Sequence, residues 1–254
     1  MKKILLASAA LAALSFATSA SAADLGAAPY VKAAPPVAAL NWTGLYIFGG
    51  AGGGLWTADN NSPGNRTQRL GGDGWYGTVG IGYDWQLNSK WVLGLFGDAQ
   101  FGEVKGSMED SAQNLEGAVK LRNAYAAGAR LGYLVAPNVL SYVNAGWAGS
   151  DWSGATMTTL DKDVFGAKTG SFSTNGWFVG GGVENNLDFF GISAPGWFMK
   201  TEYRAAYYDN VNLNETDAKG VTLNRQLNFK PWTQNVSTSL VYRFNWNGPV
   251  VARY

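Results

Sequence analysis

Apolar and polar residues alternate one by one along most of the chain after residue 41, and this period of two predicts β-strands with two unlike faces. The alternation is clearest from Trp75 to Leu87, where large apolar side chains share one face and Asp84 lies on the other with glycine and threonine. Similar runs cover 91–101, 121–133, 177–187, 197–207 and 235–244, and less regular runs cover 43–57 and 139–152. The pattern therefore predicts eight strands.

Short and long connections alternate between these strands. The short ones are 86–90, 135–138 and 188–195, and the long polar ones are 58–73, 103–118, 153–171 and 209–231. Bacterial outer-membrane barrels have short periplasmic turns, longer outer loops and an even number of strands. We therefore predict an all-β fold, an eight-stranded antiparallel up-and-down transmembrane β-barrel, with the four long segments displayed as loops outside the cell.

The composition agrees with a membrane barrel. Charged residues make up 15% of the chain, whereas soluble proteins carry about 25%. The chain also has 34 glycines, which a strongly bent closed sheet tolerates better than a helix does. The glycine clusters 49–54 and 180–182 do not complete a nucleotide-binding motif and do not begin a helix, so they indicate bending of the barrel.

Aromatic side chains gather near both ends of the predicted apolar faces. Membrane barrels carry such girdles because amphipathic rings favour the headgroup level. The predicted girdle residues are Trp75, Trp85, Trp91, Phe101, Tyr133, Trp177, Trp197 and Tyr207.

The polar faces of the strands carry a mixture of acids and bases that would point into the barrel. The predicted interior charge cluster is Asp84, Asp98, Arg122, Arg130, Glu184, Lys200, Glu202, Arg204 and Arg243. One interpretation is a salt-bridged plug, because buried charges need partners and the interior of eight strands is just wide enough for side chains. The other is a constricted path for ions or small solutes. We favour the plug.

The chain contains no histidine and no cysteine. This excludes catalysis by Ser-His-Asp and Cys-His groups and removes the commonest transition-metal ligand. The acidic segments 109–110 and 161–163 lack the spacing of a calcium-binding EF-hand loop. The sequence therefore predicts no catalytic, cofactor-binding or metal-binding residues and no enzymatic activity.

The first 22 residues are typical of a secretory signal peptide. Lys2 and Lys3 precede an apolar stretch over 4–17, and Ala20–Ala22 forms an A-x-A cleavage pattern. Removing the two lysines from 19 basic residues leaves 17 against 18 acidic ones, a balance that favours no nucleic-acid partner. We predict a signal peptide over 1–22, an Ala/Pro-rich periplasmic tether over 23–41, a barrel over 42–246 and a periplasmic tail over 247–254.

Two motifs resemble those of a known family. Residues 41–47, Asn-Trp-Thr-Gly-Leu-Tyr-Ile, are similar to the N-W-T-G-F-Y-x-G opening of the small alphaproteobacterial outer-membrane β-barrel family. Its members are OmpA-like eight-stranded barrels often called porin-family or outer-membrane immunogenic proteins. Residues 240–244 resemble the C-terminal insertion signal, with Tyr242 and Phe244 as its aromatic residues. That signal usually ends the chain, but ten residues follow here, 245–254.

The resemblance implies a surface antigen of the Gram-negative cell envelope, exported to the outer membrane, with a structural and display role and no catalysis. The implied partners are outer-membrane lipid and lipopolysaccharide, the barrel assembly machinery during insertion, and an undefined surface partner for the outer loops. One alternative is a narrow porin. Others are an adhesin or ligand-binding surface protein, in which haem would need a tyrosine ligand, and a soluble lipocalin-like barrel.

Overall fold

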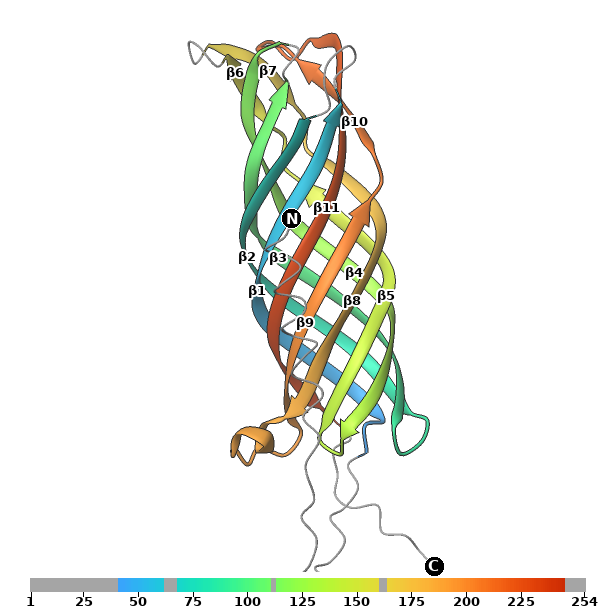
Figure 1. The fold of residues 1–254 in the computed structure, drawn as a ribbon. Helices are drawn as coiled ribbons and strands as arrows, with labels where there is room; N and C mark the ends of the chain where they lie inside the picture. The colour runs from blue at the N-terminus through green and yellow to red at the C-terminus, as the bar shows by residue number, and fades with distance from the viewer. Residues whose placement is uncertain (1–40, 62–67, 111–112, 160–163, 245–254) are drawn as a thin grey trace, which may run out of the picture. The chain divides into compact units, whose positions relative to one another are not determined.

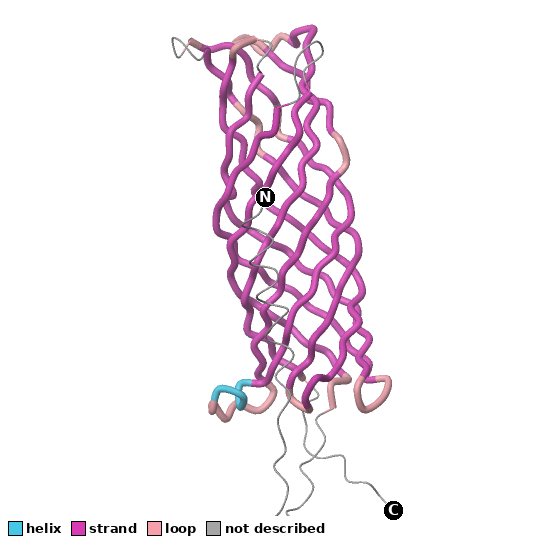
Figure 2. The backbone as a smooth tube through the Cα atoms, in the orientation of Figure 1, coloured by secondary structure: helices cyan, strands magenta, loops and turns pink. Residues whose placement is uncertain are grey.

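The structure, a computed structural model, describes residues 41–61, 68–110, 113–159 and 164–244. Strands make up almost all of this part of the chain (Figures 1 and 2). They are β1 (Gly44–Asn61), β2 (Gln68–Gln86), β3 (Trp91–Asp110), β4 (Leu115–Ala136), β5 (Val139–Trp152), β6 (Thr156–Thr159), β7 (Phe165–Thr169), β8 (Phe172–Asn186), β9 (Trp197–Tyr208), β10 (Val211–Thr216) and β11 (Thr222–Arg243). A short 3-10 helix, η1, covers Leu187–Phe190.

The predicted signal peptide, tether residues 23–40 and everything after Phe244 lie outside the described residues. Within them, no helix is both long and apolar enough to cross a membrane.

Eight of the strands form a closed antiparallel ring, which we call the membrane ring. Its order is β1-β2-β3-β4-β5-β8-β9-β11, and β11 pairs with β1 to complete it. Every strand has two hydrogen-bonded neighbours, as a sheet in lipid requires. The prediction of an eight-stranded up-and-down barrel is confirmed.

The ends of the described barrel lie together at one end of the ring. The amide of Phe244 donates a hydrogen bond to the carbonyl of Leu45, at 3.0 Å. The short connections 87–90, 137–138 and 187–196 lie at this same end (Figure 1). Short turns mark the periplasmic end of an outer-membrane barrel, so the opposite end points away from the cell.

A second closed ring, the outer ring, continues from the first at this opposite end. Beyond β5, strand β4 pairs with β6, which leads through β7 and β10 to β11. The outer ring thus keeps β1 to β4 and β11, and it replaces β5, β8 and β9 by β6, β7 and β10. It again has eight strands and no open edge.

The predicted long outer loops are therefore wrong in their extent. Most of 58–73 and 103–118 belongs to strands β1 to β4, and 209–231 contains β10 and the first half of β11. The segment 153–171 forms the hairpin of β6 and β7. These segments lack the outward apolar face that marked strands in lipid, because their apolar side chains point inward.

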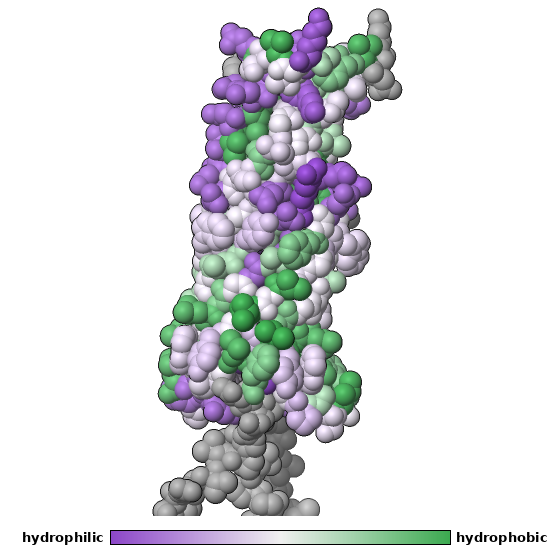
Figure 3. Space-filling view, turned by 180° about the vertical axis from the view of Figure 1, so that it is seen from behind, coloured by the Kyte–Doolittle hydropathy of each residue, from purple (hydrophilic) through white to green (hydrophobic). Residues whose placement is uncertain are grey.

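The two rings have opposite polarity. The membrane ring exposes large apolar side chains and buries charged ones, whereas the outer ring is built like a water-soluble barrel (Figure 3, lower and upper parts). The buried core of the outer ring consists of Trp56, Ala58, Leu70, Val104, Met108, Leu115, Val119, Leu121, Trp152, Ala155, Met157, Ala167, Leu213, Leu227 and Phe229. The change of polarity places the bilayer around the membrane ring alone.

Close contact between strands explains some of the glycines. A Cβ atom on Gly50 would lie 2.1 Å from the carbonyl oxygen of Thr238, and one on Gly176 would lie 1.9 Å from that of Tyr207. No side chain fits at these distances, so glycine is required where the sheet curves this tightly.

The core of the outer ring gives a first prediction. Phe229 packs edge-on against Trp56 and Trp152, with ring centroids 5.7 and 5.4 Å away. Truncating a buried phenylalanine costs about 3 to 5 kcal/mol. We expect Phe229→Ala to lower the free energy of unfolding by this amount, measured by urea titration of the refolded protein in detergent. Thr222→Ala, an exposed change on the same strand, should alter it by less than about 0.5 kcal/mol, and equal effects would contradict the packed core.

Candidate functional site

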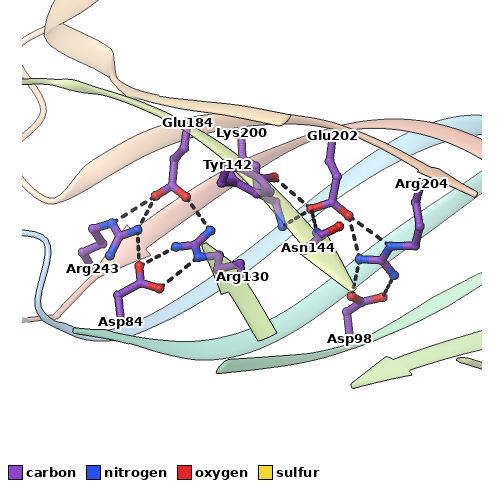
Figure 4. Close-up of polar contacts among 10 residues, drawn as sticks. All are labelled: Asp84, Asp98, Arg130, Tyr142, Asn144, Glu184, Lys200, Glu202, Arg204 and Arg243. Carbon is purple, nitrogen blue, oxygen red and sulfur yellow. Dashed lines mark hydrogen bonds and ion pairs between the residues drawn. The ribbon is translucent and has the colours of Figure 1, made fainter. Parts of the chain in front are cut away.

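The charged residues inside the membrane ring form two groups (Figure 4). The group nearer the periplasm joins Asp84, Arg130, Glu184 and Arg243, which come from β2, β4, β8 and β11. Arg130 binds both oxygens of Asp84 and also donates to Glu184 at 3.0 Å. Arg243 donates to Glu184 at 2.7 Å and lies 2.8 Å from Asp84. Two arginines and two carboxylates therefore close a ring of ion pairs across the lumen.

The second group is centred on Arg204 of β9. Its guanidinium binds both oxygens of Asp98 on β3, at 2.9 and 2.7 Å, and one oxygen of Glu202 at 2.6 Å. The other oxygen of Glu202 accepts hydrogen bonds from Tyr142 at 2.8 Å and Asn144 at 3.0 Å. Opposite charges in such bidentate geometry form strong, direction-specific contacts.

Lys200 completes the set. Its ammonium lies 3.8 Å from Glu202 and 3.3 Å from the ring centroid of Phe48, so a carboxylate and an aromatic face share its charge. The two groups together contain four acids and four bases, all buried, and their charges sum to zero. The acids are Asp84, Asp98, Glu184 and Glu202, and the bases are Arg130, Lys200, Arg204 and Arg243.

Aromatic rings fill the remaining space around the arginines. Arg130 lies 4.4 Å from the ring of Tyr46, Arg204 lies 4.7 Å from that of Phe178, and Arg243 lies 4.6 Å from that of Trp42. Farther out, Asn235 donates to Gln100 at 3.1 Å, and the apolar core of the outer ring lies beyond. Within the described residues, the lumen is therefore packed with side chains along both rings.

The structure places eight of the nine predicted interior charges inside the lumen, but the prediction for Arg122 is wrong. A β-bulge lies between Leu121 and Asn123, where the pairing of β4 with β5 shifts by one residue. Such a shift exchanges the two faces of a strand. Leu121 thus points into the outer core, and Arg122 is exposed on the outer wall.

The eight predicted girdle aromatics all lie on the outside of the membrane ring, with exposed fractions from 36% for Tyr133 to 79% for Trp75. Trp91 packs against Tyr133 at one end, and Trp177 stacks on Tyr207 at the other, with centroids 5.2 and 4.7 Å apart. The structure adds Trp147, which is 48% exposed and pairs in register with Trp177. The alternation along 139–152 was too irregular to assign it.

Sequence reasoning also missed the uncharged partners of the ion network. Tyr142 and Asn144 lie on the inward face of β5, where a strict alternation of residues 140, 142 and 144 was the available signal. Trp42, before the first strand, accepts a hydrogen bond from Arg243 through its carbonyl at 3.2 Å. Nothing in the composition of that segment indicates such a contact.

The chemistry of the site is that of a scaffold. No group of three or more acids among the described residues is arranged to hold a metal ion. The carboxylates are saturated by arginine, tyrosine and amide donors, and they tie together strands that are not neighbours in the sheet. The site can hold the wall in shape and obstruct the lumen.

A separate buried acid lies in the outer ring, outside the bilayer. Glu215 of β10 is buried and lies 3.1 Å from the Nε of Arg225. Burial raises the pKa of the Glu215 carboxyl above its ordinary value of 4.5, and the neighbouring carboxylate of Asp110 raises it further, although Arg225 acts in the opposite direction. Glu215 pairs with Thr169 where β10 meets β7, in a contact of only two residue pairs.

The ion network predicts that two arginines that look alike in sequence, Arg130 and Arg122, contribute very differently to the stability of the fold. Arg130→Met leaves Asp84 and Glu184 buried with too little positive charge, and breaking a buried pair costs about 3 to 5 kcal/mol. Arg122→Met removes an exposed charge and should change stability by less than about 0.5 kcal/mol. Urea unfolding of both variants in detergent tests this, and equal losses would mean that both side chains point inward.

The buried acid predicts a pH-dependent outer ring. Because the pKa of Glu215 is higher in the folded chain than in the unfolded one, the protonated carboxyl stabilises the fold below about pH 4.5, and this contribution is lost as the pH rises through the raised pKa. Hydrogen exchange of β7 and β10 should therefore be faster in the wild type than in Glu215→Gln at about pH 8, with a smaller difference at about pH 5. If the ratio of the exchange rates of wild type and variant did not change with pH, the prediction of a raised pKa for Glu215 would be contradicted.

Comparison with known proteins adds the family. No family model matches the chain. The 31 kDa outer-membrane immunogenic proteins of Brucella melitensis biotype 1 and Brucella suis biovar 1 are each 32% identical to it over 257 residues, which cover 96% of this chain and 100% of theirs.

Among solved structures, the chain is similar to a major outer membrane protein from Thermus thermophilus, with a TM-score of 0.46, 14% identity and coverage of 78% of this chain and 99% of that one. It is also similar to the outer membrane protein OprG from Pseudomonas aeruginosa, with a TM-score of 0.45, 9% identity and coverage of 80% and 98%. The identity and full-length coverage of the Brucella relatives show that this chain belongs to the family of 31 kDa outer-membrane immunogenic proteins.

Proposed function

We propose that this outer-membrane protein is a closed, non-conducting barrel without catalytic activity, which anchors a folded surface structure to the cell envelope. The observation that carries the proposal is that the lumen is packed at two levels by different means. The membrane ring is obstructed by four acids and four bases of zero net charge, and the outer ring is filled by an apolar core.

The ion pairs argue against the narrow porin. A conducting filter needs groups that bind an ion weakly enough to release it. Here the arginines hold carboxylates in bidentate contacts, such as those of Arg204 with Asp98 at 2.9 and 2.7 Å. An ion passing this level would have to separate buried pairs, and most of the side chains that fill the outer ring beyond are apolar.

The outer ring supports the role in surface display. It continues the sheet beyond the aromatic girdle, and each of its strands pairs with a neighbour on both sides, so its wall has a defined shape. Antibodies to such a surface would recognise side chains from several strands rather than one flexible loop. The absence of catalysis is supported by the lack of histidine and cysteine in the chain and by the hydrogen bonds and ion pairs that occupy the carboxylates of the membrane ring.

The closing strand supports a role for the barrel assembly machinery in insertion. Tyr242 packs against Trp197 and Phe244, with centroids 5.1 Å away in both cases. Phe244 is 48% exposed at the periplasmic end of the ring. An exposed aromatic at the end of the last strand is accessible to a machinery that binds β11 before the ring closes.

A planar-bilayer measurement tests the closed lumen. Refolded residues 23–254, shown to be folded by a heat-dependent gel shift, should produce no steady current steps, and Glu202→Gln should remain silent because aromatic rings still fill the lumen. A porin known to conduct serves as the positive control. Reproducible steps in the wild type that change in size in Glu202→Gln would instead make the protein a narrow porin lined by these charges.

A further inference from the structure

One wall of the outer ring has an unusual surface, which we call the amide wall. It consists of the outward side chains of β10 and the first part of β11, which are uncharged and polar. They are Asn212, Asn214, Thr216, Thr222, Asn224, Gln226 and Asn228. Each can donate and accept hydrogen bonds.

The amides are held in place by one another. Gln226 donates to the side-chain oxygen of Asn214 at 2.8 Å, and Asn228 donates to that of Asn212 at 3.0 Å. These pairs face each other in the register of the two strands. Each bond uses one N–H and one oxygen lone pair, which leaves further N–H groups and the second carbonyl of each pair for an external ligand. Their orientation is thus fixed before any ligand arrives.

The amide wall begins directly above the bilayer. Along the outward face of β11, Lys230 and then Trp232 follow Asn228 towards the membrane. Trp232 stacks on Tyr207, with ring centroids 5.9 Å apart, and so extends the outer aromatic girdle. The wall is therefore continuous with the lipid interface and stands where the headgroups of neighbouring lipids rise beside the barrel.

Another wall of the outer ring differs in its chemistry. On β3 and β4, Glu103 binds Lys105 at 2.9 Å and Lys120 at 3.2 Å, and Arg122 is exposed nearby. Charged side chains of this kind suit phosphate groups or counter-ions. The amide wall, by contrast, consists of uncharged side chains, and lysines lie only at its borders. Lys230 lies opposite Asp59 in the register, Lys168 lies opposite Thr216, and Lys219 lies in the turn between β10 and β11.

We propose that the amide wall binds the neutral sugars of the lipopolysaccharide that surrounds the barrel in its own membrane. Sugars present rows of hydroxyl groups, which pair with amides as both donors and acceptors. Successive amide pairs on one face of a strand lie about 7 Å apart, so they form a ladder suited to an extended chain lying along the wall. The inference rests on the outer ring facing outward, as in the proposed function, but not on the lumen being closed.

The first experiment uses core oligosaccharide released from lipopolysaccharide by complete deacylation. We expect saturable binding to the refolded full-length barrel in detergent, followed by titration calorimetry. The double variant Asn214→Ala/Gln226→Ala should bind at least about tenfold more weakly, since it removes two hydrogen-bonding amides. The control Ser107→Ala/Thr156→Ala, on exposed positions of β3 and β6, should bind like the wild type.

Several outcomes would overturn the proposal. One is that the wild type, shown to be folded by the gel shift, does not bind the oligosaccharide. Another is that the control variant loses as much affinity as the amide variant. A third is that binding is lost when the oligosaccharide is dephosphorylated, which would show recognition of phosphate. A self-association of the barrel that the amide variant alone abolishes would assign the wall to a second copy of the chain. A conducting lumen would contradict the proposed function but would leave the binding of the oligosaccharide to the amide wall unaffected.

A second measurement identifies the source of the sugar. Thermal unfolding in vesicles containing lipopolysaccharide should occur at a higher temperature than in phospholipid vesicles, and the amide variant should lose most of that increase. If the wild type binds the free oligosaccharide but lipopolysaccharide in the vesicle has no effect, the wall serves a soluble glycan, and the assignment to the barrel's own membrane is wrong.

Discussion

Backbone hydrogen bonding dictates this architecture, because a strand edge in lipid leaves polar groups without partners at a cost of several kcal/mol each. The chain meets this requirement in the membrane ring and closes a second ring in water that shares five of the eight strands. β1 to β4 and β11 run through both rings, and only β4 and β11 change neighbours where β5 and β9 end. Closure therefore does not stop at the membrane surface. The segments that would otherwise be loops become β6, β7 and β10 and complete the second ring.

Once the rings are closed, the surroundings decide what fills them. The membrane ring must present apolar side chains to lipid, so alternation forces polar ones inward, where burial is tolerable only because four acids meet four bases. The outer ring stands in water, so the same alternation puts apolar residues inside. The ion pairs do more than neutralise charge. Arg204 of β9 reaches Asp98 on β3 across the lumen, and such links hold the cross-section of a narrow barrel fixed.

These rules explain what could be predicted from the sequence. The eight membrane strands, the girdle and most interior charges follow from alternation with a strongly apolar face. The outer ring escaped prediction because its outward face is polar and its inward face includes small residues such as Ala58, so it reads as a loop. The inward placement predicted for Arg122 was wrong for another reason. A single extra residue at the bulge reverses the faces beyond it, and the run around Leu121 contains no mark of that insertion. Partners such as Tyr142 are set by three-dimensional proximity.

In the outer ring, folding constrains the inward side chains but not the outward ones. Inward residues such as Leu213 and Phe229 are fixed by the core, but outward residues in water contribute little to stability and can vary. β3 and β4 carry mixed charges there, as an ordinary soluble surface does. β10 and β11 carry amides and hydroxyls instead, paired across the strands by Gln226 and Asn214. Neither ring closure nor the core demands that uniformity. The proposed contact with the sugars of the surrounding lipopolysaccharide would account for it, because these sugars are the neighbours of a barrel in the outer leaflet.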